Sequence, residues 1–147
     1  MAQDWIEREV VIDASRERVW AVLTESGHVA RWFGDAAEID PRPGGKAAFG
    51  WTGDGVFDAI VQRVERPSAF SFRWARDPGV EPGEGTATLV EFTLTEVPIG
   101  TVLRVVETGF AELRIGDAER AKAAADNARG WAGELAELKE HAERSAT

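Results

Sequence analysis

The sequence predicts an α+β domain in which a curved antiparallel sheet of about seven strands is covered by one long C-terminal helix, with two short helices near the N-terminus. Two observations support this fold class. Short runs of alternating apolar residues are separated by turn residues, through connections too short for crossover helices. The segment from 117 to 144 contains no proline and carries one apolar stripe at helical spacing. Since 147 residues is a usual domain length, residues 1–147 are expected to form a single domain.

The N-terminal part is predicted to form one strand and two short helices. Residues 5 to 13 alternate apolar and polar side chains, as a half-buried strand does. Ser15 can cap the helix that follows, and Gly27 is expected to end it. A second short helix is expected from His28 to Phe33, stopped at Gly34.

Further strands are expected between short, turn-rich connections, which favour antiparallel hairpins. They are Ala36 to Asp40, Lys46 to Trp51, Val56 to Glu65, Ala69 to Ala75, Thr86 to Glu96, and Thr101 to Phe110. Their alternation makes one face of the sheet apolar, as Phe70, Phe72 and Trp74 show within one strand. That apolar face needs a cover.

The last segment supplies the cover as one long helix from Asp117 to Arg144, with Asp117 as its N-cap. Its apolar stripe consists of Ala124, Ala128, Trp131, Leu135, Leu138 and Ala142. Gly130 and Gly133 flank Trp131, and each costs about 1 kcal/mol of helix stability relative to alanine. Two such costs beside one bulky side chain indicate a close backbone approach or space left next to the ring, unless packing holds the helix well enough to tolerate both glycines.

Composition excludes several functional classes. The net charge of -9 disfavours nucleic acid and anionic membrane surfaces as partners. The absence of cysteine removes disulfides and thiolate metal sites, and the two histidines, His28 and His141, lie far apart on different elements, so neither a metal nor another cofactor is expected. No apolar stretch is long enough to span a membrane, and the N-terminus lacks the pattern of a signal peptide, so the cytoplasm is the expected location.

The order of the elements and several short motifs resemble a known family. The motifs are Ile12-Asp13-Ala14-Ser15-Arg16-Glu17-Arg18-Val19-Trp20, His28-Val29-Ala30-Arg31-Trp32-Phe33-Gly34, Pro43-Gly44-Gly45-Lys46, Thr108-Gly109-Phe110 and Gly130-Trp131. Together they resemble the Hsp90-ATPase-activator-like branch of the START-like (SRPBCC) superfamily, which is related to polyketide cyclases and the major birch pollen allergen. The resemblance covers nearly the whole chain and implies a helix-grip fold with an apolar cavity between the sheet and the long helix.

The expected cavity wall is a set of aromatic and apolar side chains, joined by one acidic group. The predicted ligand-binding residues are Trp32, Phe33, Phe49, Trp51, Phe72, Trp74, Glu107, Trp131 and Leu135. Strand parity sends Glu107 inward together with Leu103 and Val105, where it could anchor a ligand or act as an acid or base. Arg73 and Arg76 are candidate partners for it. The indole N–H groups of buried tryptophans also need acceptors, and a ligand oxygen could be one.

Three functions remain open, in order of preference. The first is binding or sequestration of a small, mostly hydrophobic ligand in the cavity, which members of the superfamily perform for lipids, polyketides and hormones. The second is a protein interaction of the Hsp90-activator type, a minor alternative because those activators rely on a further N-terminal domain that is not in this sequence. The third is a cyclase or hydrolase reaction, which needs a second titratable group beside Glu107. Binding is favoured over catalysis, and a homodimer is left open.

Overall fold

The computed structural model describes residues 5–144, and their elements follow the predicted order. The first four residues, on which the absence of a signal peptide partly rests, lie outside this range. The strands are β1 (Trp5–Ile12), β2 (Ala36–Ile39), β3 (Lys46–Trp51), β4 (Gly55–Glu65), β5 (Ala69–Ala75), β6 (Ala87–Val97) and β7 (Gly100–Thr108). The helices are α1 (Arg16–Thr24), α2 (Ser26–Trp32), the short 3-10 helix η1 (Phe110–Glu112) and α3 (Asp117–Arg144).

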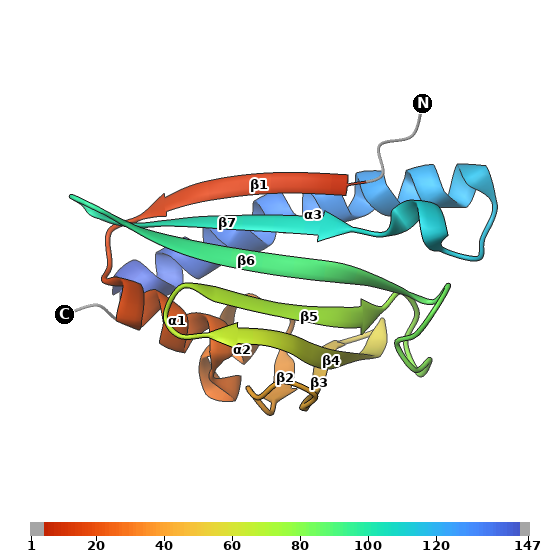
Figure 1. Ribbon diagram of the computed structural model, residues 1–147, viewed down its shortest axis with the longest axis horizontal. Coiled ribbons are helices and arrows are strands. Elements are labelled where there is room, and N and C mark those ends of the chain that lie inside the picture. The colour runs from red at the N-terminus through yellow and green to blue at the C-terminus, as the bar shows by residue number, and fades with distance from the viewer. Residues whose placement is uncertain (1–4, 145–147) are drawn as a thin grey trace.

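The strands form one antiparallel sheet in the order β1-β7-β6-β5-β4-β3-β2. β1 therefore pairs with the last strand, and every other strand pairs with a neighbour in sequence, as short hairpin connections dictate. Figure 1 shows α3 running along the sheet behind β1 and β7, while α1 and α2 lie near one end of the sheet. The predicted fold class, a curved sheet held against a long C-terminal helix, is confirmed.

The core lies between α3 and the face of the sheet that the alternation marked as apolar. Trp131, Leu135 and Leu138 of α3 are buried there, as the helical stripe predicted. Phe33, just after α2, packs among aromatic rings from α2, the sheet and α3. Its ring stacks on that of Trp131 at 5.3 Å between centroids and meets the ring of Trp51 edge-on at 4.9 Å.

The other predicted element ends differ from the observed ones by at most two residues, and three expectations were wrong for an identifiable local reason. Gly27 does not end α1: Glu25 adopts an extended conformation after Thr24, and Gly27 lies inside α2. The last strand ends at Thr108, because Gly109 at φ 102° turns the chain into η1. Asp117 is the first residue of α3 and not its cap, since the Gly116 carbonyl accepts from Arg120 N–H at 2.9 Å.

Two other residues at helix ends act as predicted. The Ser15 hydroxyl caps α1 by accepting from Arg18 N–H at 3.1 Å. Gly34 follows α2 with φ 73°, and a Cβ there would lie 2.4 Å from the Gly50 carbonyl oxygen. Only glycine permits both that conformation and that contact, so Gly34 sets how closely the chain passes β3.

Candidate functional site

The main cavity lies between the N-terminal half of α3 and the sheet, and is partly open to solvent. Its volume is about 630 Å³, within the range of about 300 to 1,000 Å³ that is usual for small-molecule sites. Aromatic side chains from several different segments form much of its wall: Phe33, Trp51, Phe57, Trp74, Phe110 and Trp131. The sheet, the residue after α2, η1 and α3 therefore all contribute to one apolar surface.

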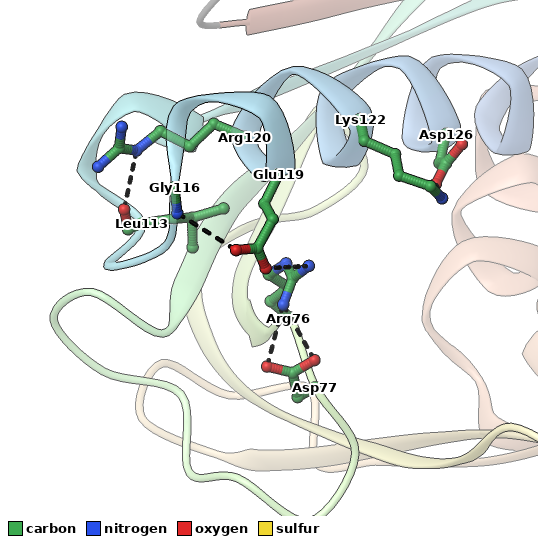
Figure 2. Close-up of polar contacts among 8 residues, drawn as sticks. All are labelled: Arg76, Asp77, Leu113, Gly116, Glu119, Arg120, Lys122 and Asp126. Carbon is green, nitrogen blue, oxygen red and sulfur yellow. Dashed lines mark hydrogen bonds and ion pairs between the residues drawn. The ribbon is translucent and has the colours of Figure 1, made fainter.

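The rim of the cavity is polar, and most of its charges are paired. Arg76, at the end of β5, lies between Asp77 and Glu119 of α3 (Figure 2). Its guanidinium is 3.2 Å from the Asp77 carboxylate and 4.0 Å from that of Glu119. Asp126, which also lines the cavity, pairs with Lys122 at 2.7 Å and with Arg129. Its hydrogen bond to Lys122 contributes most to a lowered pKa of Asp126.

Glu107 is fully buried behind this cavity and receives hydrogen bonds from four side chains. Trp131 Nε1 donates to Oε1 at 2.9 Å. Trp74 Nε1 and the Thr88 hydroxyl donate to Oε2, at 2.9 Å and 2.5 Å. The Asn127 amide reaches both oxygens, at 3.1 Å and 3.2 Å. Glu107 thus ties β5, β6 and α3 together through one carboxylate.

The chemistry of the donors explains why an acid stands at this position. An indole N–H can only donate, so the buried Trp131 and the partly buried Trp74, whose N–H groups face one point, require an acceptor there. A carboxylate accepts through both oxygens, whereas an amide would present an NH₂ group to at least one donor. The acceptors predicted for the indoles of Trp74 and Trp131 are therefore supplied by the protein. Trp32 Nε1 likewise donates to the Val22 carbonyl at 2.9 Å.

The structure divides the predicted site residues into two groups. Phe33, Trp51, Trp74 and Trp131 line the cavity. The others are buried outside its lining: Trp32, Phe49, Phe72, Glu107 and Leu135. Parity did send Glu107 inward, but no arginine pairs with it among the described residues, and Arg76 is engaged at the rim instead. Ligand contact by these residues stays a prediction.

Among the carboxylates that line the cavity in residues 5–144, Glu134 is the one with a buried oxygen that lacks a partner. It lines the cavity from α3, and its Oε2 is buried with no hydrogen-bond partner in residues 5–144. Burial raises the pKa of Glu134 to about 7, and the neighbouring charge of Glu137 adds to the rise. An acid that is half protonated near neutral pH and faces a cavity can accept from a ligand donor or exchange a proton.

The sequence reasoning overlooked Asn127, Thr88 and Glu134. A signal for two of them was present, because Asn127 and Glu134 lie four residues before and three residues after Trp131. That spacing puts them on the same face of α3 as the ring. The apolar stripe alone does not identify them, because polar residues at the edge of such a stripe can also face solvent. Thr88 had a signal of another kind, because the strand alternation that turns Val90 and Phe92 inward turns Thr88 inward with them.

The two glycines of α3 leave space and do not permit a close approach. A Cβ built at Gly130 or at Gly133 would meet no atom within 4 Å. Only Gly130 lines the cavity, however. A close backbone approach is therefore excluded at both positions: Gly130 fits space left at the cavity, and Gly133 fits a glycine that the helix tolerates.

The two histidines were expected to be far apart, and the structure corrects this. His28 of α2 and His141 of α3 meet with Nδ1 and Nε2 at 3.0 Å, because α2 packs against the C-terminal half of α3. Burial lowers the pKa of His141, and the charges of His28 and Arg18 act in the same direction. Among the described residues no three or more His, Cys, Asp or Glu side chains form a group that could hold a metal ion.

Stability should depend on pH through Glu134. Its pKa is about 7 in the folded protein against 4.5 ordinarily, so its contribution is complete below about pH 4.5 and is lost as pH rises through about 7. Glu134→Gln, which cannot ionise, should therefore be more stable than the wild type at about pH 8.5, and similar to it at about pH 5. Because the side chain is partly exposed, we expect solvent screening to reduce the gain to about 1 to 2 kcal/mol.

Urea denaturation followed by circular dichroism at both pH values measures this difference. Glu137→Gln is the matched control, because it removes an exposed carboxylate that does not line the cavity. Its effect should be smaller at both pH values. An equal gain for Glu134→Gln at the two pH values would contradict the raised pKa.

Comparisons with known proteins agree with this architecture. A family model described as "Activator of Hsp90 ATPase homolog 1-like protein" matches residues 13–143. No curated protein matches the chain.

Within residues 5–144, none of the helices combines the length and apolar character needed to cross a bilayer.

Several solved structures share the fold. A protein from Mesorhizobium loti has a TM-score of 0.81 at 23% identity, covering 97% of this chain and 99% of that one. The solution structure of a Bacillus halodurans protein has a TM-score of 0.77 at 26% identity, covering 97% and 100%. The solution structure of the Aha1 dimer from Colwellia psychrerythraea has a TM-score of 0.76 at 22% identity, covering 96% and 97%.

Proposed function

Because the chain belongs to the family of Activator of Hsp90 ATPase homolog 1-like proteins, whose fold suits a ligand-binding module, we propose that it binds a small, mostly hydrophobic molecule in the cavity between the sheet and α3. The observation that carries this proposal is the cavity itself, with about 630 Å³ of space against rings such as Trp51, Trp74 and Trp131. Burial of a ligand's apolar surface against these rings supplies the driving force for binding.

The enzyme alternative has less support at this site. General acid–base catalysis requires titratable groups within hydrogen-bond reach of one substrate. The oxygens of Glu107 already accept hydrogen bonds from protein donors. Among residues 5–144, no titratable side chain is hydrogen-bonded to Glu134 Oε2 as a second acid or base would be. A role as an Hsp90-type partner and a homodimeric state stay predictions, although the Colwellia psychrerythraea structure is described as a dimer of that protein.

Filling the cavity from α3 should weaken binding. Gly130 lines the cavity with open space beside its Cα, so Gly130→Leu places a side chain in that space. Leucine also favours the helix more than glycine does. Gly133→Leu changes the helix in the same way outside the cavity. The fluorescent neutral probe N-phenyl-1-naphthylamine should bind the wild type saturably, with Gly130→Leu weakening it at least about tenfold and Gly133→Leu leaving it unchanged.

The control separates blockage from a general change in α3. Circular dichroism should show that both variants are folded. If the wild type takes up neither this probe nor any member of an apolar metabolite library, the proposed function fails. Equal binding by the Gly130→Leu variant would place the bound probe elsewhere on the molecule.

A further inference from the structure

The starting observation is the unsatisfied oxygen of Glu134. Nearly all buried polar atoms in folded proteins have a hydrogen-bond partner, and each exception calls for an explanation. Glu134 Oε2 is buried without one in the described part of the chain, while the residue lines the cavity. Glu107, in contrast, is saturated by four side chains. A donor group on a bound ligand would give Glu134 the partner that the protein does not supply.

The charges around the cavity select the kind of donor. Of the described residues, four carboxylates line it, against a single guanidinium. That guanidinium, Arg76, is already held by Asp77 and by Glu119 (Figure 2). The part of the wall formed by residues 5–144 thus offers no free cation to receive an anionic ligand, whereas the excess of carboxylates attracts a cation.

The aromatic wall suits the same ligand class. Trp131 precedes Glu134 by three residues on α3, so the ring and the carboxylate lie on one face of the helix. Organic cations bind favourably against the faces of tryptophan and phenylalanine rings, and desolvation strengthens the attraction. Phe33 and Trp74 lie against Trp131, with ring centroids at 5.3 Å and 6.2 Å from it.

We propose, on the basis of the proposed function, that the cavity takes a hydrophobic amine: an apolar or aromatic body that packs on the rings and a protonated nitrogen that binds Glu134. The ammonium group donates to the oxygen that has no partner in the described part of the protein. The paired rim charges, which include Arg76 and Asp126, stay as they are. Glu134 sets the preference for a cation, and the aromatic wall supplies the affinity that is independent of charge.

A pair of ligands with one ring system tests the charge preference. The probes are 1-naphthylmethylamine, which is cationic, and 1-naphthylmethanol, which is neutral, both titrated by calorimetry at about pH 8. The wild type should bind the amine at least about tenfold more tightly than the alcohol. Glu134→Gln should reduce amine binding to about the level of the alcohol and so remove the preference for the cation. Glu137→Gln, a matched loss of charge outside the lining, should keep the preference.

The pH profile provides a second readout. Since the pKa of Glu134 is about 7, amine affinity should rise between about pH 5.5 and about pH 8 in the wild type, with a proton released on binding, and alcohol affinity should not. The rise should disappear in Glu134→Gln.

Each outcome separates the two proposals. Equal or tighter binding of the alcohol by the wild type, or a preference that survives Glu134→Gln, overturns the amine proposal and leaves the ligand-binding function intact, provided that Gly130→Leu blocks the alcohol. If neither probe binds the wild type, the amine proposal is overturned. If N-phenyl-1-naphthylamine and the apolar library also fail, the ligand-binding function falls with it.

Discussion

Glu107→Ala is expected to lower the free energy of unfolding by about 3 to 5 kcal/mol. The substitution removes the acceptor shared by two indole N–H groups, a hydroxyl and an amide, of which the Trp131 indole and the Thr88 hydroxyl belong to buried residues. Each buried donor left without a partner costs about 1 to 3 kcal/mol, and the costs do not add fully because the donors share one site. Urea denaturation followed by far-ultraviolet circular dichroism measures the loss.

Two further variants show whether the loss comes from the hydrogen bonds. Glu107→Gln preserves the shape but turns an NH₂ group toward N–H donors, so it should still cost about 2 kcal/mol or more. Glu91→Ala removes a carboxylate from the opposite face of the neighbouring strand, and should change stability by about 0.5 kcal/mol or less. If Glu107→Gln proved as stable as the wild type, the stabilising role of Glu107 as a shared hydrogen-bond acceptor would be refuted.

Trp131→Ala should be comparably damaging, with a loss of about 3 to 5 kcal/mol. The ring is 2% exposed, stacks on Phe33, and donates to Glu107 Oε1, so the substitution opens a void and frees an acceptor at once. Trp5→Ala is the matched control, because that ring is 45% exposed at the start of β1. The control should lose much less stability in the same denaturation assay.

The two sites should also be coupled. Since Trp131 and Glu107 form one hydrogen-bonded network, the double variant should lose less stability than the sum of the single losses. Strict additivity would mean that the two side chains act independently. In that case the network would have no role beyond its separate contacts.

Much of the fold was predictable because periodicity and turn chemistry act locally. Two strands, β3 and β5, and the whole of α3 have the predicted boundaries. The predicted boundaries were wrong where a residue typical of one element end is preceded by another residue that turns the chain earlier. Gly27 is typical of a helix end, yet Glu25 turns the chain first, and the run through Phe110 looks like strand although Gly109 ends it.

The candidate site was less predictable, because its polar groups come from distant parts of the chain. Alternation was enough to send Glu107 inward. The donors that saturate it lie 19 to 33 residues away, on three elements. No local pattern reports that convergence, so a group expected to contact a ligand was found holding the structure together. Glu134 was passed over for the converse reason, as a charged residue beside an apolar stripe.

The sequence by itself determined the order of the elements and the buried face of most strands, because these follow from spacing between near neighbours. Its motifs also resembled the family that the family model then showed. Only the tertiary structure decided which acid is satisfied and which keeps a buried oxygen without a partner among residues 5–144. That choice depends on where α3 lies across the sheet, since the same helix brings Asn127 and Trp131 to Glu107 and leaves Glu134 facing the open cavity.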